Sequence, residues 1–318
     1  MRRLPLLAAG FYVACQVDHP KSVAPAVSSS SSSSTSATAV STSSWAKPLD
    51  TARTDAGASD SGSAEVPRPP RTWSRDDDAN KKTLALFERF GVRSDVEHEH
   101  LMDGGFRGKI HIVPAEPVGA DRKHLEWLTN AYEKMDAWMK VFASRAPEHR
   151  YRFTPITLKF FISENRTTPS AYAFDWSIAY NLHGSLLQSQ TGVLETFIHE
   201  TFHLNDQAHN DWSGRTMSDL YGRIRTKCGK SSPCFAPYSP GTTMVRGGTY
   251  YAFHAENDVR EYAAELMVRF YKETDAAFKG VASSNAAKFK CGPEENKLAW
   301  ESLLKEFFDG KDVTASCQ

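Results

Sequence analysis

Hydrophobic positions recur at helical spacing in several segments of this 318-residue chain. Between residues 121 and 142 the apolar positions fall three and four residues apart, which predicts a long amphipathic helix. A shorter helix is predicted over residues 78–90, because Gly91 supplies a stop signal after the last apolar position. Three further helices are predicted towards the C-terminus, over residues 216–227, 257–274 and 294–308.

Strand patterns lie between these helices. Residues 109–113 read as one strand, and residues 156–162 alternate apolar and other side chains as a second strand does. A longer extended stretch is predicted over residues 171–180. Helices and strands mixed in this order predict an α+β fold.

The strongest chemical signal follows that stretch, in the segment Phe-Ile-His-Glu-Thr-Phe-His at residues 197–203. On a helix, His199 and His203 lie one turn apart on the same face, while apolar residues cover the other side. Two neutral imidazoles at this spacing can bind one Zn²⁺, and Glu200 can reach a water on that ion. Chance can also produce such a pattern, but the helical context favours one zinc ion per chain.

A catalytic zinc site needs a third protein ligand, and two residues compete for this role. His209 extends the motif to H-E-x-x-H-x-x-D-x-x-H, which resembles the metzincins, with Asp206 where those enzymes have glycine. Glu261 begins an E-x-x-x-E segment that resembles the gluzincins, including thermolysin and the lethal-factor-like peptidases. This second resemblance implies that Glu261 binds zinc and that Glu265 orients a histidine ligand. Alternatively, Glu261 could close a capping box that Asp258 opens.

The gluzincin resemblance rests on two short segments and implies a zincin-like fold. In that fold a small, mostly antiparallel sheet packs on the H-E-x-x-H helix, a mainly helical lower part follows, and an edge strand binds an extended peptide. Residues 171–180 are the candidate edge strand. The implied activity is zinc-dependent peptide hydrolysis with Glu200 as general base. Tyr250, Tyr251 and His254 are candidates to stabilise the oxyanion, with Tyr251 and His254 preferred; otherwise Gly247-Gly248 is a turn and the tyrosines are packing residues.

Two other functions remain open at this stage. A zinc-stabilised binding module without turnover would use the same metal ligands, although it would have no need for a base at Glu200. A zinc amidase that acts on cell-wall or small-molecule amides would use the same chemistry on another substrate.

The N-terminus reads as an export signal, because a basic start is followed by a short apolar core that ends near residue 14. Tyr12-Val13-Ala14-Cys15 resembles a bacterial lipobox, with Tyr12 where leucine is usual. We therefore expect residues 1–15 to be a signal peptide and Cys15 to be lipidated, with ordinary signal-peptidase cleavage as the alternative. Residues 16–73 are rich in Ser, Thr and Pro and are predicted to be a disordered linker. The folded metallopeptidase-like domain is predicted over residues 74–318, anchored at the bacterial cell envelope.

The remaining four cysteines, an even number in an exported domain, suggest two disulfides. Three pairings are possible, and Cys228–Cys234 with Cys291–Cys317 is the most economical. The formal net charge is zero and no basic cluster stands out, which argues against nucleic acid as a partner. The expected partners are a peptide or protein substrate and, through the lipid anchor only, a membrane; the sequence gives no indication of oligomeric state.

Overall fold

The computed structural model describes residues 70–104, 108–245, 247–281 and 288–317. The predicted signal peptide, Cys15 and the linker up to residue 69 lie outside the described residues. The folded part begins earlier than residue 74, because Trp73 is buried in the core and its Nε1 donates a hydrogen bond to Thr83 Oγ1 at 2.6 Å. Within the described ranges, no helix combines the length and the apolar character that a membrane span requires.

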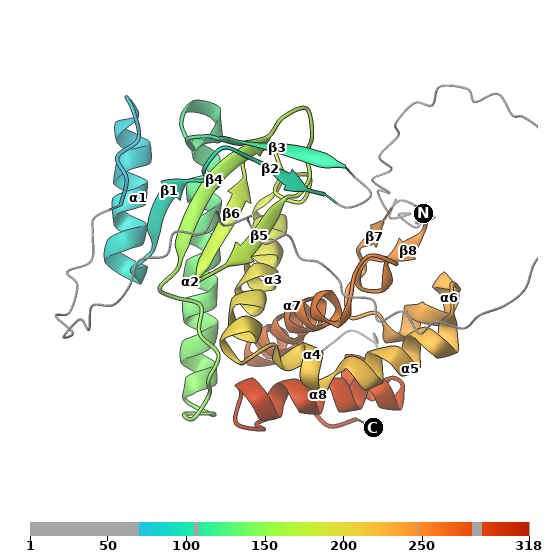
Figure 1. The fold of residues 1–318 in the computed structure, drawn as a ribbon. Helices are drawn as coiled ribbons and strands as arrows, with labels where there is room; N and C mark the ends of the chain where they lie inside the picture. Colours follow the sequence, from blue (N-terminus) through green and yellow to red (C-terminus); the bar gives the residue numbers. More distant parts are fainter. Residues whose placement is uncertain (1–69, 105–107, 246, 282–287, 318) are drawn as a thin grey trace, which may run out of the picture. The chain divides into compact units, whose positions relative to one another are not determined.

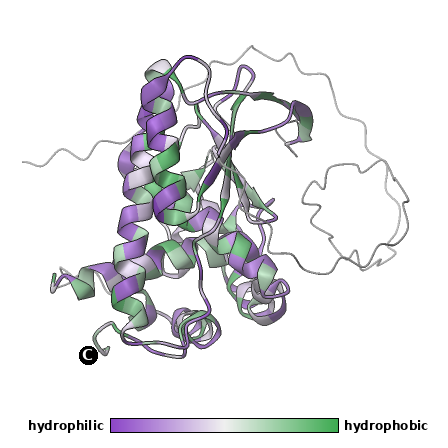
Figure 2. Ribbon diagram, turned by 90° about the vertical axis from the view of Figure 1, so that its left-hand side faces the viewer, coloured by the Kyte–Doolittle hydropathy of each residue, from purple (hydrophilic) through white to green (hydrophobic). Residues whose placement is uncertain are grey.

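The two predicted N-terminal helices are confirmed to within two residues at each end. Helix α1 spans Asp77–Phe90; the Asp76 side chain caps its start, and Gly91 ends it in the left-handed conformation at φ 69°. Helix α2 spans Lys123–Ala143 and buries one long apolar face. Hydrophilic and hydrophobic residues share the helices in Figure 2, as an amphipathic pattern requires.

A six-stranded mixed sheet forms the upper part of the domain (Figure 1). Its strands are β1 Arg93–Val96, β2 His100–Asp103, β3 Lys109–Pro114, β4 Thr157–Ser163, β5 Ala171–Phe174 and β6 Ser177–Asn181. The order is β2-β3-β4-β6-β5, and β1 pairs with the first half of β4 on the edge that β3 occupies further along. Three of the five pairings are antiparallel, whereas β1–β4 and β4–β6 are parallel.

The predicted extended stretch over residues 171–180 is a hairpin rather than one strand. Asp175 and Trp176 have positive φ angles of 44° and 53°, and they turn the chain between β5 and β6. Only β5 therefore lies at the edge of the sheet, while β6 is buried throughout. The sequence concealed this turn because neither glycine nor proline marks it.

The lower part is mainly helical, as predicted. It comprises α3 Gln190–Ala208, α4 Trp212–Thr216, α5 Ser218–Cys228, α6 Ser232–Phe235, α7 Val259–Phe278 and α8 Glu294–Phe307. The helix predicted over residues 216–227 is confirmed as α5, which begins two residues later, and the short helix α4 precedes it. A two-stranded hairpin of β7 Met244–Val245 and β8 Thr249–Tyr250 turns at Gly247 and Gly248, both with positive φ. Short 3-10 turns complete the described chain at Gly119–Arg122, Ala236–Tyr238, Tyr251–Phe253 and Phe289–Cys291.

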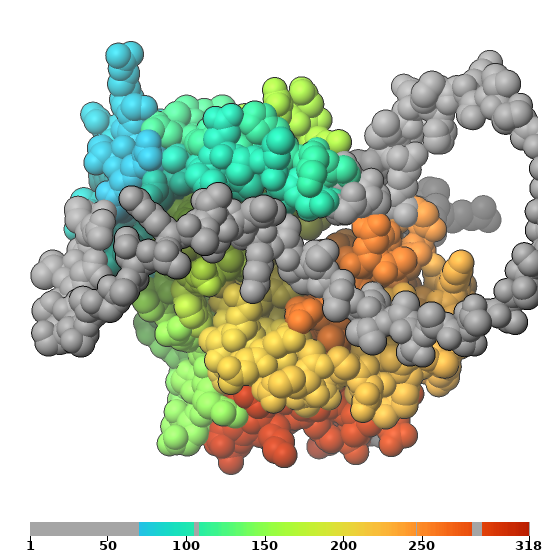
Figure 3. All heavy atoms as spheres, viewed as in Figure 1, coloured from blue at the N-terminus to red at the C-terminus, as the bar shows by residue number. Residues whose placement is uncertain are grey.

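The main core lies where α2, α7 and α8 meet beneath the sheet. Trp138 packs edge-on against Phe270, and its Nε1 donates a hydrogen bond to Thr274 Oγ1 at 2.9 Å. Phe270 in turn contacts Trp300 and Phe308 of the C-terminal segment, which is the red layer at the lower edge of Figure 3. Both predicted disulfides are confirmed, with Cα–Cα distances of 5.3 Å for Cys228–Cys234 and 5.4 Å for Cys291–Cys317.

Candidate metal centre

Helix α3 carries the H-E-x-x-H motif and presents both histidines on one face. Ser189 caps the helix by accepting the N–H of Gly192, and the buried residues that follow fix the rotation of the helix against the core. His199 and His203 consequently point the same way, with their Nε2 atoms 3.1 Å apart. Both rings are largely enclosed, with 13% and 9% of their side-chain surfaces exposed.

Helix α7 brings a carboxylate to these histidines. Asp258 caps the start of α7 by accepting the N–H of Arg260, so the following turn faces α3. Glu261 Oε2 lies 3.0 Å from His199 Nε2, and Oε1 lies 3.5 Å from His203 Nε2. The side chain of Glu261 therefore points to the histidines and does not act as the second half of a capping box, although Asp258 is the N-cap.

The three side chains have the spacing that a tetrahedral metal ion needs. Bonds of 2.0–2.2 Å to imidazole nitrogen and carboxylate oxygen place neighbouring ligand atoms about 3.3 Å apart. The observed separations of 3.0, 3.1 and 3.5 Å bracket this value. His199, His203 and Glu261 could thus hold one metal ion.

Glu265, one turn after Glu261, lies on the other side of the His199 ring. Its Oε1 is 3.7 Å from His199 Nδ1, which is the position of an acid that orients a metal-binding imidazole. Gly241 leaves the space that this carboxylate occupies, since a Cβ at position 241 would lie 1.6 Å from Glu265 Oε2. The loop before β7 therefore shapes the centre through Glu265.

The charges in this enclosed site perturb the pKa values of its members. Burial alone lowers the pKa of His199, but the carboxylates of Glu261, Glu200 and Glu265 outweigh it and raise that pKa above its usual range. Burial raises the pKa of Glu200 to about 7, partly opposed by His199. Burial acts on Glu261 in the same direction, but the two histidines outweigh it and lower the pKa of this carboxyl group. The carboxylates of this site thus favour a positively charged group between them.

Tyr251, one of the candidates chosen from the sequence, lies beside His199 and Glu261. Its ring centroid is 6.1 Å from that of His199, and its hydroxyl is close enough to Glu261 for that carboxylate to affect its pKa. Burial, and then the charge of Glu261, raise the pKa of Tyr251 far above its usual value, so the hydroxyl remains a proton donor at neutral pH.

The other sequence candidates have different contacts. His209 Nδ1 pairs with Glu306 Oε1 at 2.6 Å and its ring packs on Phe307, so the structure joins it to α8 rather than to His199 and His203. His254 Nδ1 accepts the backbone N–H of Glu256 at 3.4 Å in the loop before α7. Tyr250 belongs to β8 and packs against the hydrophobic core.

A polar clamp at the end of α3 holds the two ligand-bearing helices together. Asp206 stays within α3, where its buried carboxylate accepts the N–H and hydroxyl of Ser213, both at 2.7 Å. Arg260 makes two hydrogen bonds to Asp211 at 2.7 and 2.6 Å, from the residue directly before Glu261. Sequence reasoning missed this clamp, because its partners lie up to 49 residues apart and none belongs to a motif.

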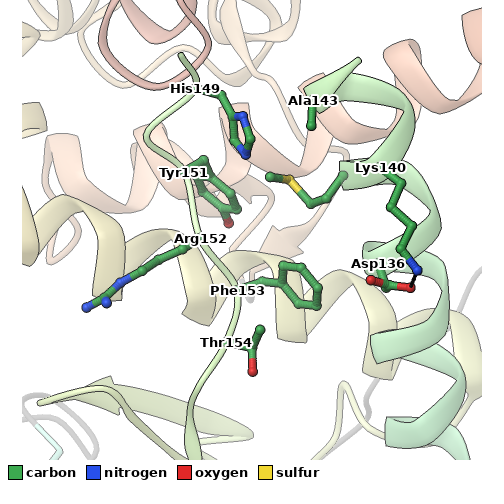
Figure 4. A pocket seen from close by; sticks show the side chains of 9 residues that line it. Asp136, Lys140, Ala143, His149, Tyr151, Arg152, Phe153 and Thr154 are labelled. Carbon is green, nitrogen blue, oxygen red and sulfur yellow. Dashed lines mark hydrogen bonds and ion pairs between the residues drawn. The ribbon is translucent and has the colours of Figure 1, made fainter. Parts of the chain in front are cut away.

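Two shallow hollows lie apart from the metal-binding residues. The one in Figure 4 has a volume of about 260 Å³ and lies between α2 and residues 149–154, with Tyr151 and Phe153 facing Lys140 and Asp136 across it. A second, of about 210 Å³, lies between the β5–β6 turn at Trp176 and the last turns of α3.

Comparison of the chain with protein-family models, with curated proteins and with solved structures finds no match.

Proposed function

We propose that this protein is a zinc-dependent metallopeptidase. The convergence of His199, His203 and Glu261 from two helices carries the proposal, because it joins the motif to a third ligand 58 residues away at tetrahedral spacing. Zinc bound by these residues would act as a Lewis acid and bring the pKa of a water towards neutrality. The N-terminal sequence supports the cell envelope as the place of action.

Glu200 is the proposed general base. It is buried beside His199, and its pKa of about 7 in the metal-free site means that a bound dication would hold it ionised at neutral pH. An ionised carboxylate in this position can take a proton from water and return it to the leaving amine. A structural zinc site would gain nothing from such a group, since an uncompensated buried carboxylate costs stability.

Tyr251 is the proposed oxyanion donor. It remains protonated at neutral pH and lies at the wall of the site, so its hydroxyl can donate a hydrogen bond to a substrate oxygen that acquires negative charge. The edge strand β5, whose four residues are all half-buried, offers its backbone to an extended peptide. Substrate bound along β5 would extend beside α3.

Zinc content and turnover, measured on the same preparations, test this proposal. We expect one zinc per chain at this centre, a loss of that zinc in Glu261→Ala and its retention in His209→Ala. Casein hydrolysis should fall by about 10²–10⁴-fold in Glu200→Gln while zinc stays bound, as the loss of a general base predicts.

Other outcomes would reassign the protein. Zinc at this centre without hydrolysis of any peptide would indicate a binding module, and hydrolysis of cell-wall fragments in place of casein would indicate an amidase. Loss of zinc in His209→Ala but not in Glu261→Ala would reject the ligand set.

A further inference from the structure

A second group of metal-binding side chains lies at the junction of β1 and β2, around Glu97, His98 and His100. The register pairs His100 with Ile112, so both side chains lie on the same face of the sheet. Ile112 and Phe161 belong to a small cluster separate from the main core, which holds Phe160. Because Phe160 and Phe161 point to opposite faces, His100 lies across the sheet from the core that encloses α3.

Glu97 is the unusual member of this group, because its side chain is 1% exposed while the neighbouring His98 is 61% exposed. A hydrogen bond from its backbone N–H to the carbonyl of Phe160, at 3.0 Å, fixes it against β4. The carboxylate contacts Nδ1 of His98 and accepts the backbone N–H of His98 at 2.8 Å. On its other side, Tyr172 is buried enough to raise its pKa, and the charge of Glu97 raises it further. A carboxylate enclosed in this way gains from a nearby cation.

The two histidines are arranged to share that cation. Their rings stack at a centroid distance of 4.4 Å with an interplanar angle of 23°, which keeps the two rings side by side. His100 Nδ1 donates a hydrogen bond to the carbonyl of His98 at 2.9 Å, which leaves the lone pair of its neutral ring on Nε2. In this tautomer Nε2 can bind a metal ion while Nδ1 keeps its hydrogen bond to the backbone.

Nearby charged groups already have partners of their own. His111 donates hydrogen bonds to two carboxylates, from Nδ1 to Glu164 at 2.8 Å and from Nε2 to Glu99 at 2.9 Å. Glu99 is therefore engaged with His111, although it lies between His98 and His100 in the sequence. The intervening acid thus faces away from the group formed by Glu97, His98 and His100.

We propose that Glu97, His98 and His100 bind a second divalent transition-metal ion, independently of the centre on α3 and α7. One ligand atom from each residue lies within 4.8 Å of the other two, and a shared ion requires about 3.3 Å. Because the His98 ring is 61% exposed, it is free of the packing that would prevent a rotation towards the ion, while His100 keeps its hydrogen bond. Imidazole nitrogen with one carboxylate oxygen is a donor set that suits Zn²⁺, Cu²⁺ and Ni²⁺. The ion would fasten the β1–β2 connection to the sheet.

The test measures Zn²⁺ stoichiometry in the full chain without a histidine tag, in a His199→Ala/Glu261→Ala background that removes two ligands of the first centre. We expect this variant to retain one zinc, by equilibrium dialysis and elemental analysis, and to lose it when His98→Ala and His100→Ala are added. His183→Ala is the matched control, because this histidine is also exposed, at 56%, and lies near a carboxylate, Asp121, at 3.6 Å. A Cu²⁺ electron paramagnetic resonance spectrum with two nitrogen ligands should disappear in the same variant.

The outcome is independent of peptidase activity. A background variant that binds no zinc, or that keeps it after removal of His98 and His100, overturns the proposal. Because both substituted side chains are solvent-accessible, circular dichroism and the melting temperature of the metal-free variants should match those of the background.

Discussion

Replacing Gly241 with alanine tests how the loop before β7 controls the metal centre. The added Cβ would lie 1.6 Å from Glu265 Oε2, and because Cβ atoms do not approach other atoms closer than 3.0 Å, the carboxylate must withdraw by about 1.4 Å. Because Glu265 Oε1 lies 3.7 Å from His199 Nδ1, we expect this displacement to disturb the contact between the carboxylate and the ring. Gly241 does not have a positive φ, which means that alanine fits the backbone without strain.

The expected effect falls on zinc affinity and not on folding. Loss of an acid that orients a metal-bound histidine lowers metal affinity by roughly 10–100-fold, or about 1.4–2.7 kcal/mol. The displaced atoms are the end of a flexible side chain, so the free energy of unfolding of the metal-free protein should change by less than about 1 kcal/mol. Competition between the protein and a chromogenic chelator measures the affinity, and urea denaturation in chelator measures the stability.

Two further variants make the result decisive. Gly222→Ala is the matched control, because Gly222 lies in α5 with no atom within 4 Å of its added Cβ, and its zinc affinity should equal that of the wild type. Glu265→Gln should lose affinity to a similar extent, and its combination with Gly241→Ala should lose little more, since both act on one contact. Unchanged zinc affinity in Gly241→Ala, or strictly additive losses in the double variant, would refute the reasoning.

Three other predictions concern protons and buried polar contacts. Because the pKa of His199 is raised in the metal-free site, zinc binding at pH 7.5 should release a proton from this ring, measured by calorimetry in buffers of different ionisation enthalpy; Glu265→Gln, which leaves the three proposed ligands in place, should reduce that release. Burial lowers the pKa of His124 from 6.5 to about 4, so its contribution to stability is complete above pH 6.5 and is lost as pH falls through 4. That loss should be about 2–3 kcal/mol in urea titrations and should be absent in His124→Leu. Asp206→Ala removes two hydrogen bonds to Ser213 and should lower the free energy of unfolding by about 2–3 kcal/mol, whereas an unaltered denaturation midpoint would contradict this.

The sequence predicted those parts of the fold in which one local pattern dominates. The apolar face of α2 and the glycine stop after α1 follow from periodicity and from backbone freedom at Gly91. Strands β1 and β2 escaped prediction because each has only four residues, with polar or charged side chains among them. The β5–β6 turn escaped because two residues other than glycine adopt positive φ there.

The candidate site likewise has residues whose relation is local in the sequence and residues that only tertiary packing brings together. His199, Glu200 and His203 share one helix turn, so their relation is local and the motif reveals it. Glu261 could be proposed only through the resemblance of its E-x-x-x-E segment, since its approach to α3 depends on tertiary packing. The roles of Gly241 and of the Arg260–Asp211 contact could not be predicted from a local pattern. Each depends on a side chain that is distant in the sequence.

The clamp formed by Asp206, Ser213, Asp211 and Arg260 has a consequence for how the protein would acquire its ion. It joins α3 to α7 through protein contacts alone, and the aromatic core beneath the sheet supports α7 in the same way. The arrangement of the ligands is then a property of the folded chain, in contrast to a zinc finger, whose folding depends on its ion. Chelation should therefore be reversible, with the emptied chain still folded and ready to be refilled by zinc from its surroundings.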